Sequence, residues 1–89
     1  MRESKVRKAL HDRIAALGGE YRAAKWIGAR HCPDDFVMLD GRHIWVEGKR
    51  PGKTAREGQA REHERMRAAG CEVLVINTVA LVDLHFPLN

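Results

Sequence analysis

Two acidic residues at the open end of a predicted β-hairpin are spaced as a metal site would require. Asp34 precedes one strand-like run and Glu47 follows the next, with Asp40-Gly41 between the runs. This dipeptide favours a two-residue type I′ turn. With that turn Leu39 pairs with Arg42, and continuing the register places Asp34 directly opposite Glu47.

Two opposed carboxylates need compensation, because their Cβ atoms would lie about 4.5–5.5 Å apart and like charges there repel. A cation between them provides it, since Mg²⁺ takes oxygen ligands from one or two carboxylates and keeps waters or a phosphate in its other positions. Gly48 has no side chain to obstruct the approach of its backbone carbonyl to the cation. Lys49 lies two residues after Glu47, so its side chain is on the same face of the strand. The alternative is a hairpin end with a Lys-Glu pair.

These groups suit phosphodiester hydrolysis with Mg²⁺ or Mn²⁺. A metal polarises the phosphate and lowers the pKa of a bound water, while a neighbouring lysine orients that water or stabilises developing charge. Gln59 shares a helix stripe with His63 and Met66 and is expected to face inward. An inward polar side chain needs a partner, so Gln59 either joins the site or bonds to backbone.

The elements that position these groups follow from the hydrophobic pattern. A helix is predicted by Val6, Leu10, Ile14 and Leu17 at helical spacing, and a second helix by the capping-box pattern of Thr54 with Glu57. The expected elements are a helix over 4–17, strands over 20–27, 35–39 and 42–46, a helix from 54 to Gly70, a strand over 72–76 and a helix over 79–84.

This α-β-β-β-α-β-α order indicates one domain, 1–89, of the α/β class, a small mixed β-sheet flanked by helices. A strand, a helix of about sixteen residues and another strand form a parallel crossover, here attached to an antiparallel hairpin. Both hairpin strands are apolar on both faces. We therefore expect both faces of the sheet to be covered.

The motifs Cys32-Pro33-Asp34 and Glu47-Gly48-Lys49, with Gln59 on the following helix, resemble the PD-(D/E)xK nuclease superfamily. Within it, the match is closest to the virus-type replication-repair nuclease (VRR-NUC) domain, from about Lys25 to Ile76. Glu3 lies where that family has a helix-one glutamate. The chain departs from the family at Cys32, where Gly is usual, and at Asp35, which puts a second acid beside Asp34.

The resemblance implies a restriction-endonuclease-like core and metal-dependent cleavage of DNA. It implies that Asp34, Glu47 and the Gly48 carbonyl hold the metal, with Glu3 as a further acid. Lys49 and Gln59 would assist catalysis. Stand-alone viral members are homodimers akin to Holliday-junction resolvases, so the resemblance implies a homodimer that acts on branched or structured DNA.

The formal charge of +4 is local, since residues 42–67 hold eight Lys/Arg against four Asp/Glu. Such an excess suits a phosphate-rich partner, although a solvated helix face is an equal alternative. The expected DNA contacts are Arg30, Arg50, Lys53 and Arg56. A phosphate-binding P-loop ending at Lys53-Thr54 would need Gly at residue 47, which is Glu47, so no nucleotide cofactor is expected.

No apolar run reaches the roughly 20 residues of a membrane span, and residues 1–5 lack a signal peptide's apolar region. We expect a cytoplasmic protein, in the host cytoplasm if viral, with no membrane partner. Cys32 and Cys71 have no metal-ligand spacing and are expected to be reduced thiols. A chain this short buries only part of its surface on folding, so a second copy that covers more of it would add stability.

Two rival functions stay open. One is a non-catalytic DNA-binding or assembly module, and the other is a toxin-like RNase.

Overall fold

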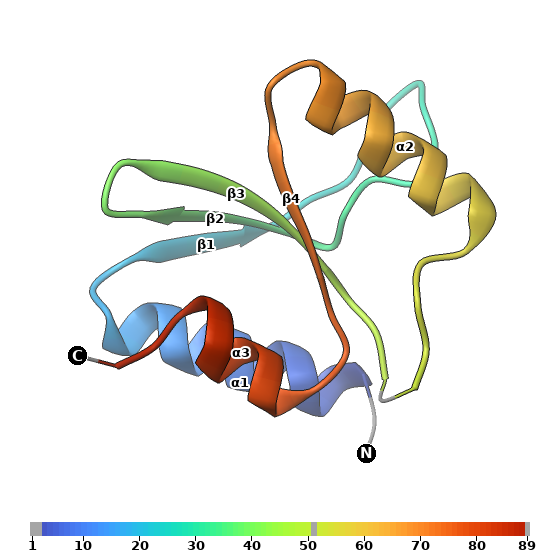
Figure 1. The fold of residues 1–89 in the computed structure, drawn as a ribbon. Coiled ribbons are helices and arrows are strands. Elements are labelled where there is room, and N and C mark those ends of the chain that lie inside the picture. Colours follow the sequence, from blue (N-terminus) through green and yellow to red (C-terminus); the bar gives the residue numbers. More distant parts are fainter. Residues whose placement is uncertain (1–2, 51, 89) are drawn as a thin grey trace.

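A four-stranded mixed sheet carries three helices in the computed structural model (Figure 1), which describes residues 3–50 and 52–88, without the side chains of residues 3 and 4. The elements are α1 (Glu3–Ala16), β1 (Glu20–Ala23), β2 (Asp35–Leu39), β3 (Arg42–Gly48), α2 (Glu57–Ala68), β4 (Glu72–Ile76) and α3 (Val79–His85). The expected order of elements and the α/β class are confirmed.

The sheet has the order β1-β2-β3-β4, with β1, β2 and β3 antiparallel and β4 parallel to β3. Asp40 and Gly41 have φ of 50° and 76°, as a type I′ turn requires. Leu39 pairs with Arg42, and the ladder ends at Asp35 opposite Val46. The register predicted from the turn and the parallel crossover are both confirmed.

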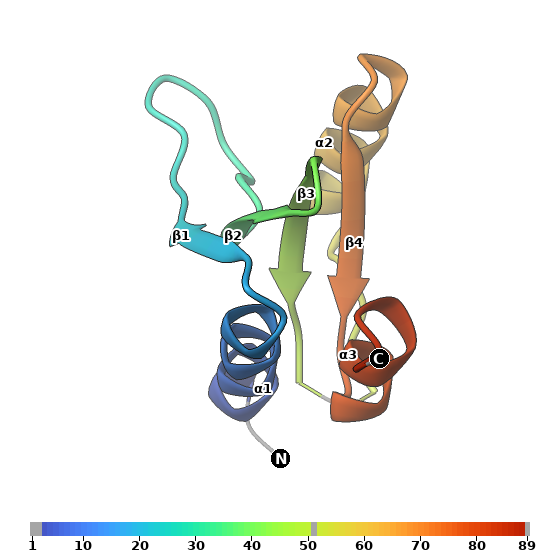
Figure 2. The same cartoon turned by 90° about the vertical axis from the view of Figure 1, so that its left-hand side faces the viewer.

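Helices α1 and α3 lie side by side on one face of the sheet (Figures 1 and 2). Their apolar stripes meet the inward positions of the strands, where alternation places every second residue on that face. The buried aliphatic core is thus on this side. It includes Val6, Leu10 and Ile14 of α1, Val82 of α3, and Val37, Ile44, Val46 and Ile76 of the sheet.

Helix α2 lies over the opposite face and packs against β4 (Figure 1). His63 and Met66 are its buried residues. Strands β1 and β2 are at the other side of the sheet, so Phe36 and Met38 remain half-buried. The expectation that both faces are covered is met only in part.

The chain after β1 differs from the expected strand over 20–27. The ladder ends at Ala23, and one further bond joins the Ala24 N–H to the Asp34 carbonyl at 2.9 Å. Trp26 then turns toward α2, where its Nε1–H donates to Glu62 Oε2 at 2.7 Å. By leaving the strand the indole gains a half-buried hydrogen-bond partner, and this long-range contact is not contained in the local sequence pattern.

Both ends of α2 differ from the predicted bounds. The helix begins at Glu57 with Arg56 as N-cap, and Gln59 Oε1 accepts the Arg56 N–H at 3.2 Å. The prediction of Thr54 as N-cap was therefore wrong. The N-cap is Arg56, two residues later, because Gln59 accepts the Arg56 N–H there. At the other end, the Cys71 N–H donates to the Met66 carbonyl at 2.9 Å around Gly70, whose φ is 100°. This is a Schellman ending.

Candidate active site

Asp34 and Gly48 are joined across the hairpin end. Asp34 Oδ2 accepts the Gly48 N–H at 2.9 Å. On the other side of β3, the Lys49 N–H donates to the Ile76 carbonyl of β4 at 2.9 Å. The N–H and C=O of one residue in an extended strand point to the same side. The Gly48 carbonyl therefore faces the Asp34 side of the strand.

Glu47 is buried on the α2 face of the sheet, with 3% of its surface exposed. Gln59 Nε2–H donates to Glu47 Oε2 at 3.1 Å. Lys49 Nζ lies 3.4 Å from the same oxygen. A buried carboxylate needs such donors, and the residue after β3 and the first turn of α2 supply them. Gln59 thus bonds to the α2 N-cap through one side-chain atom and to Glu47 through the other.

The register places Asp34 and Glu47 at the positions that follow the last ladder pair, on one face of the sheet. Each carboxylate has donors of its own in the folded chain, the Gly48 N–H for Asp34 and Gln59 with Lys49 for Glu47. Protein groups therefore supply part of the compensation that the sequence argument assigned to a cation alone.

The adjacent acid, Asp35, points to the other face of the sheet and is 1% exposed. Arg7 binds it through two bonds, Nη2 to Oδ1 at 3.0 Å and Nε to Oδ2 at 3.2 Å. His11 Nε2 lies 3.0 Å from Oδ2, and the His11 ring stacks on Tyr21 at 4.0 Å. Of the two adjacent acids, only Asp34 shares a face with Glu47.

Sequence reasoning missed this Arg7–Asp35–His11 cluster, although a signal for it exists. Asp35 has the same strand parity as Val37 and Leu39, which are core residues. A carboxylate on a core face needs a cationic partner. Arg7 and His11, four residues apart on α1, are neighbours on one helix surface and could have been proposed as those partners.

The donor set fits a hard divalent cation. Two carboxylates, of Asp34 and Glu47, and the Gly48 carbonyl are oxygen ligands of the kind that Mg²⁺ and Mn²⁺ prefer. Within the described residues, no group of three or more His, Cys, Asp or Glu side chains is arranged to hold a metal. Mg²⁺ sites typically take one or two protein carboxylates. The side chain of Glu3, the further expected acid, lies outside the described part.

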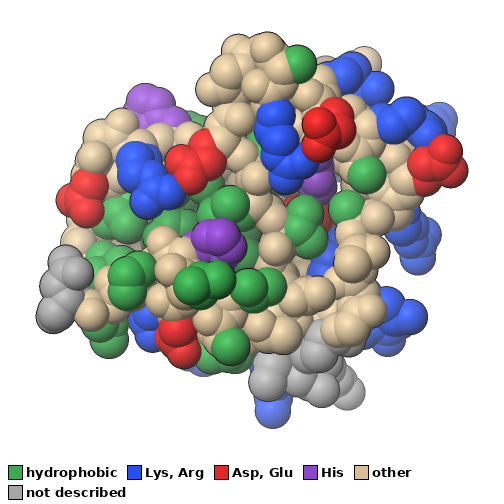
Figure 3. All heavy atoms as spheres, viewed as in Figure 1, with side chains coloured by type: hydrophobic (Ala, Val, Ile, Leu, Met, Phe, Trp, Pro, Cys, Tyr) green, Lys and Arg blue, Asp and Glu red, His purple; other side chains and the backbone are tan. Residues whose placement is uncertain are grey.

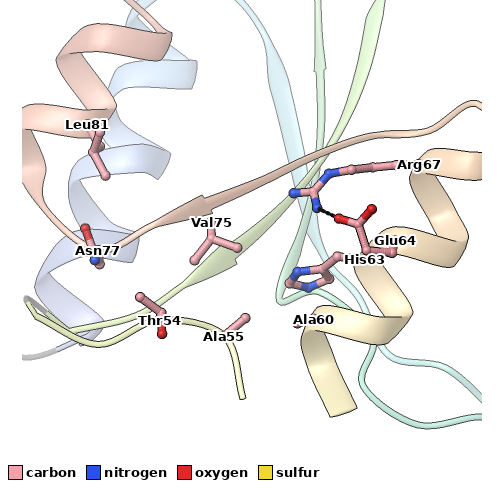
Figure 4. A pocket seen from close by; sticks show the side chains of 9 residues that line it. All are labelled: Thr54, Ala55, Ala60, His63, Glu64, Arg67, Val75, Asn77 and Leu81. Atoms are coloured by element: carbon pink, nitrogen blue, oxygen red, sulfur yellow. Dashed lines mark hydrogen bonds and ion pairs between the residues drawn. The ribbon is translucent and has the colours of Figure 1, made fainter. Parts of the chain in front are cut away.

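A hollow of about 350 Å³ lies beside the Glu47 position, between α2, β4 and the segment before α2 (Figure 4). Val75, which pairs with Glu47 in the sheet register, is one of its walls. His63 is another, 1% exposed and without a hydrogen-bond partner at Nε2. Burial lowers the pKa of His63, and the nearby Arg67 lowers it further. His63 is therefore a neutral group in the wall beside the acids.

The four cations expected to contact DNA are all exposed, in two segments next to the acids. Arg30 lies in the loop that ends at Asp34, and Arg50, Lys53 and Arg56 lie between β3 and α2. His31 has φ of 67° and packs over Gly58 of α2, where a Cβ would lie 2.6 Å from His31 Nε2.

Both cysteines are free thiols, as expected. Burial raises the pKa of the Cys32 thiol, an effect partly offset by a backbone hydrogen bond at Trp26, while the nearby acids Glu47, Asp34 and Glu62 raise it further. A thiol whose pKa is raised is a poor nucleophile at neutral pH.

The fold is that of α/β nucleases, and comparison with known proteins narrows the class. The chain is 37% identical over 92 residues to "Putative nuclease p44" of Acyrthosiphon pisum secondary endosymbiont phage 1, covering all of this chain and 97% of that protein. A solved VRR_NUC domain superposes with a TM-score of 0.85 at 34% identity, over 92% of this chain and 90% of the other. No protein-family model matches the chain.

The chain belongs to the VRR_NUC family of nucleases. The resemblance drawn from the Pro33-Asp34 and Glu47-Gly48-Lys49 motifs is therefore confirmed, together with the fold class that it implied. In the described part of the chain, no helix is long and apolar enough to cross a membrane. The metal, the roles of the individual site residues and the preferred DNA stay predictions.

Proposed function

We propose that the protein is a metal-dependent, structure-specific DNA endonuclease that hydrolyses phosphodiester bonds. The observation that carries the proposal is the convergence on Glu47, whose Oε2 accepts from Gln59 at 3.1 Å and lies 3.4 Å from Lys49 Nζ. These groups come from β3, from the residue after it and from α2, and Asp34 adds a second carboxylate from the residue before β2. Membership of a nuclease family supports the same reading.

In this proposal Mg²⁺ or Mn²⁺ is held by Asp34, Glu47 and the Gly48 carbonyl, with Glu3 of α1 as a further acid. The cation would polarise the scissile phosphate and lower the pKa of a bound water. The protein's contribution is to hold two carboxylates on one face, with donors that fix Asp34 through Gly48 and Glu47 through Gln59.

Lys49 and Gln59 act beside the ligands. The Lys49 ammonium is close enough to Glu47 to orient the attacking water or to stabilise charge that develops on the phosphate. Gln59 fixes the Glu47 carboxylate and ties it to the first turn of α2. Exposed Arg30, Arg50, Lys53 and Arg56 would bind backbone phosphates on either side of the cut.

The substrate class is tested with labelled four-way junction, flap, continuous duplex and RNA, each incubated with Mg²⁺, with Mn²⁺ or with EDTA. We expect cleavage of branched or otherwise structured DNA in either metal, with a Holliday-junction-type paired cut as the most specific form. Binding should weaken steeply as salt rises, because each phosphate contact displaces counterions. Binding without cleavage of any substrate would indicate a DNA-binding module, and preferential cleavage of RNA would indicate an RNase.

We propose further that the enzyme works as a homodimer, because paired cuts in a branched substrate need two active sites at a fixed separation. The surface best suited to a second copy is α3 with the chain that follows it. Leu84 is 70% exposed and Leu88 is 61% exposed, and Figure 3 shows hydrophobic side chains gathered over the α3 region. This surface is on the sheet face opposite Glu47, so pairing there leaves both sites open.

Light scattering tests the dimer. The expected mass is twice that of the 10.1 kDa chain. Leu84→Glu should lower it to that of one chain, because a charge at the centre of an apolar contact opposes association. A wild-type monomer that still makes paired cuts in a junction would contradict the homodimer.

A further inference from the structure

Aromatic side chains form a continuous row on the sheet face that carries Glu47. Successive rings have centroids 5.1, 4.6 and 5.9 Å apart. On β3 the row occupies the positions two and four residues before Glu47, and on β2 the position two residues after Asp34, so strand alternation puts it on the face of the proposed metal ligands. This aromatic row consists of Trp26, Trp45, Phe36 and His43.

The row is at the surface rather than in the core. It contains three of the chain's five Phe, Trp and Tyr residues. Trp26, Trp45 and Phe36 are half-buried and His43 is exposed. Helix α2 packs chiefly against β4 and reaches the row through the bond from Trp26 to Glu62, while the core on the other face is built almost entirely from Val, Leu and Ile.

The row is held in place and bordered by cations. Trp26 is fixed by its bond to Glu62, and Ile27 at the adjoining loop position is 99% exposed. Lys25 and Arg30 of the same loop are exposed. The negative charges of the neighbouring carboxylates are offset by arginines. Glu62 pairs with Arg65 at 3.0 Å, and Glu20 lies 3.9 Å from Arg22.

We propose that the aromatic row binds unpaired bases of the DNA strand whose phosphate is cut at Asp34 and Glu47. Every base has a flat face that stacks on aromatic side chains, and a positively charged border follows the backbone. Bases in a duplex are already stacked on one another and are not free to do so. The inference rests on the proposed function for the position of the phosphate, and it narrows the substrate to DNA with unpaired nucleotides next to the cut.

A second copy of the chain fits this face less well than a nucleic acid strand does. Of the three large aliphatic side chains that are strongly exposed in the described residues, Leu84 and Leu88 lie on α3 and the chain after it, at the opposite face, and only Ile27 is beside the row. The row is aromatic, lies beside exposed Lys25 and Arg30, and continues directly into the residues that would hold the scissile phosphate. Charge complementarity and this continuity assign the face to DNA.

Intrinsic fluorescence tests the proposal without any substitution, because both tryptophans of the chain are in the row. The protein in EDTA is titrated with oligo(dT) and with a duplex of the same length. We expect saturable quenching of tryptophan emission by oligo(dT) and much weaker quenching by the duplex. Binding of oligo(dT), followed by anisotropy of a labelled strand, with unchanged tryptophan emission would overturn the proposal.

A matched pair of substitutions provides the second test. Phe36→Leu removes a ring from the row, and Tyr21→Leu removes a ring from the other face of the same strand pair. Phe36→Leu should weaken oligo(dT) binding about fivefold or more, as loss of one stacked base predicts, and should leave duplex binding unchanged. Tyr21→Leu should change neither. Equal effects of the two variants would contradict the proposal.

Folding of each variant is checked by thermal unfolding, and exposed His43→Ala replaces Phe36→Leu if the latter does not fold. If the variant in the aromatic row has a changed oligomeric mass but still binds oligo(dT) as the wild type does, the row contacts a second copy of the chain, and the proposal is overturned. The proposed function fails separately: oligo(dT) quenching without any metal-dependent cleavage would refute the nuclease activity and leave the row's ligand as stated.

Discussion

Arg7 of α1 crosses Gly48 of β3 so closely that a Cβ at residue 48 would lie 2.8 Å from Arg7 Cγ. The same atom would lie 3.6 Å from Asp34 Oδ2. Arg7 has little freedom to move away, because its guanidinium holds the buried Asp35 at 3.0 Å. The glycine between Glu47 and Lys49 is therefore required by the packing of Arg7 of α1 against the strand, whereas the distance to Asp34 Oδ2 is an ordinary van der Waals contact.

Gly48→Ala should destabilise the fold by about 1–3 kcal/mol, as overpacking does at a closed position. Urea unfolding measures the loss. The control is the same substitution in an Arg7→Ala background, where the crossing Cγ is gone. There Gly48→Ala should cost less than in the wild type by about 0.5–3 kcal/mol. If the two costs simply add, Arg7 is not what excludes a side chain at residue 48.

The adjacent acids provide a matched pair with opposite expected effects. Asp34→Asn should abolish cleavage and leave the metal-free stability nearly unchanged, because the amide oxygen can still accept the Gly48 N–H and the repulsion from Glu47 is relieved. Asp35→Asn should cost about 1.5–3 kcal/mol, because a buried charged partner of Arg7 and His11 is lost.

Cleavage assays and urea unfolding of both variants measure the two effects. Folded Asp35→Asn should keep its metal dependence. A variant pattern with the roles exchanged, in which Asp34→Asn unfolds and Asp35→Asn only loses activity, would show that the wrong acid has been placed at the site.

The hairpin could be predicted from the sequence because its determinants are local. Asp40-Gly41 fixes the turn, the turn fixes the register, and the register places Asp34 and Glu47 on one face with Lys49 beside them. The inward position of Gln59 followed in the same way from helical periodicity. Its bond to Glu47 agrees with the role expected from the family motif, although the catalytic part of that role remains a prediction.

The rest could not be predicted because it depends on contacts between distant segments. Trp26 leaves the expected strand to bond with Glu62, which is 36 residues away in the chain. The start of α2 is set by Gln59, whose Oε1 accepts the Arg56 N–H and whose Nε2 donates to Glu47. This contact with β3 overrides the local capping pattern at Thr54. The Arg7–Asp35 pair joins α1 to β2 across 28 residues. The strand parity of Asp35 indicates a buried carboxylate, but which helix residue binds it depends on how α1 packs on the sheet.

Lys49→Ala should lower the rate of cleavage by about 100-fold, the scale of one lost electrostatic or acid–base group, while metal affinity changes little. The reason is that the ammonium serves the water or the phosphate and is not a ligand. Calorimetric titration with Mn²⁺ and single-turnover cleavage separate the two effects. Lys53→Ala is the control, an exposed cation whose loss should weaken DNA binding only. A large loss of metal affinity in Lys49→Ala would mean that Lys49 chiefly organises Glu47.

His63 should make the fold sensitive to mild acid. Burial, with Arg67 and Lys49, lowers the pKa of His63 from its usual 6.5, and Glu62 and Glu64 offset this only in part. Below that pH the unfolded chain takes up a proton that the folded chain does not, so stability present above about pH 6.5 is lost as pH falls through the folded pKa. Urea unfolding from about pH 7.5 to about pH 5.5 measures it. His63→Leu should flatten this slope, whereas exposed His43→Ala should not. A slope equal in His63→Leu and the wild type would place the titrating group elsewhere.

The most direct test of the account is cleavage of a labelled branched DNA by the wild-type protein and by Glu47→Gln, each with Mg²⁺ and with EDTA. Glutamine keeps the size of the side chain and removes the charge that would hold the cation, so DNA binding should persist in both proteins. We predict cutting by the wild type with Mg²⁺ alone, and none in the other three reactions. Wild-type cutting that is undiminished in EDTA, or Glu47→Gln cutting at the wild-type rate, would contradict a metal-dependent nuclease centred on Glu47.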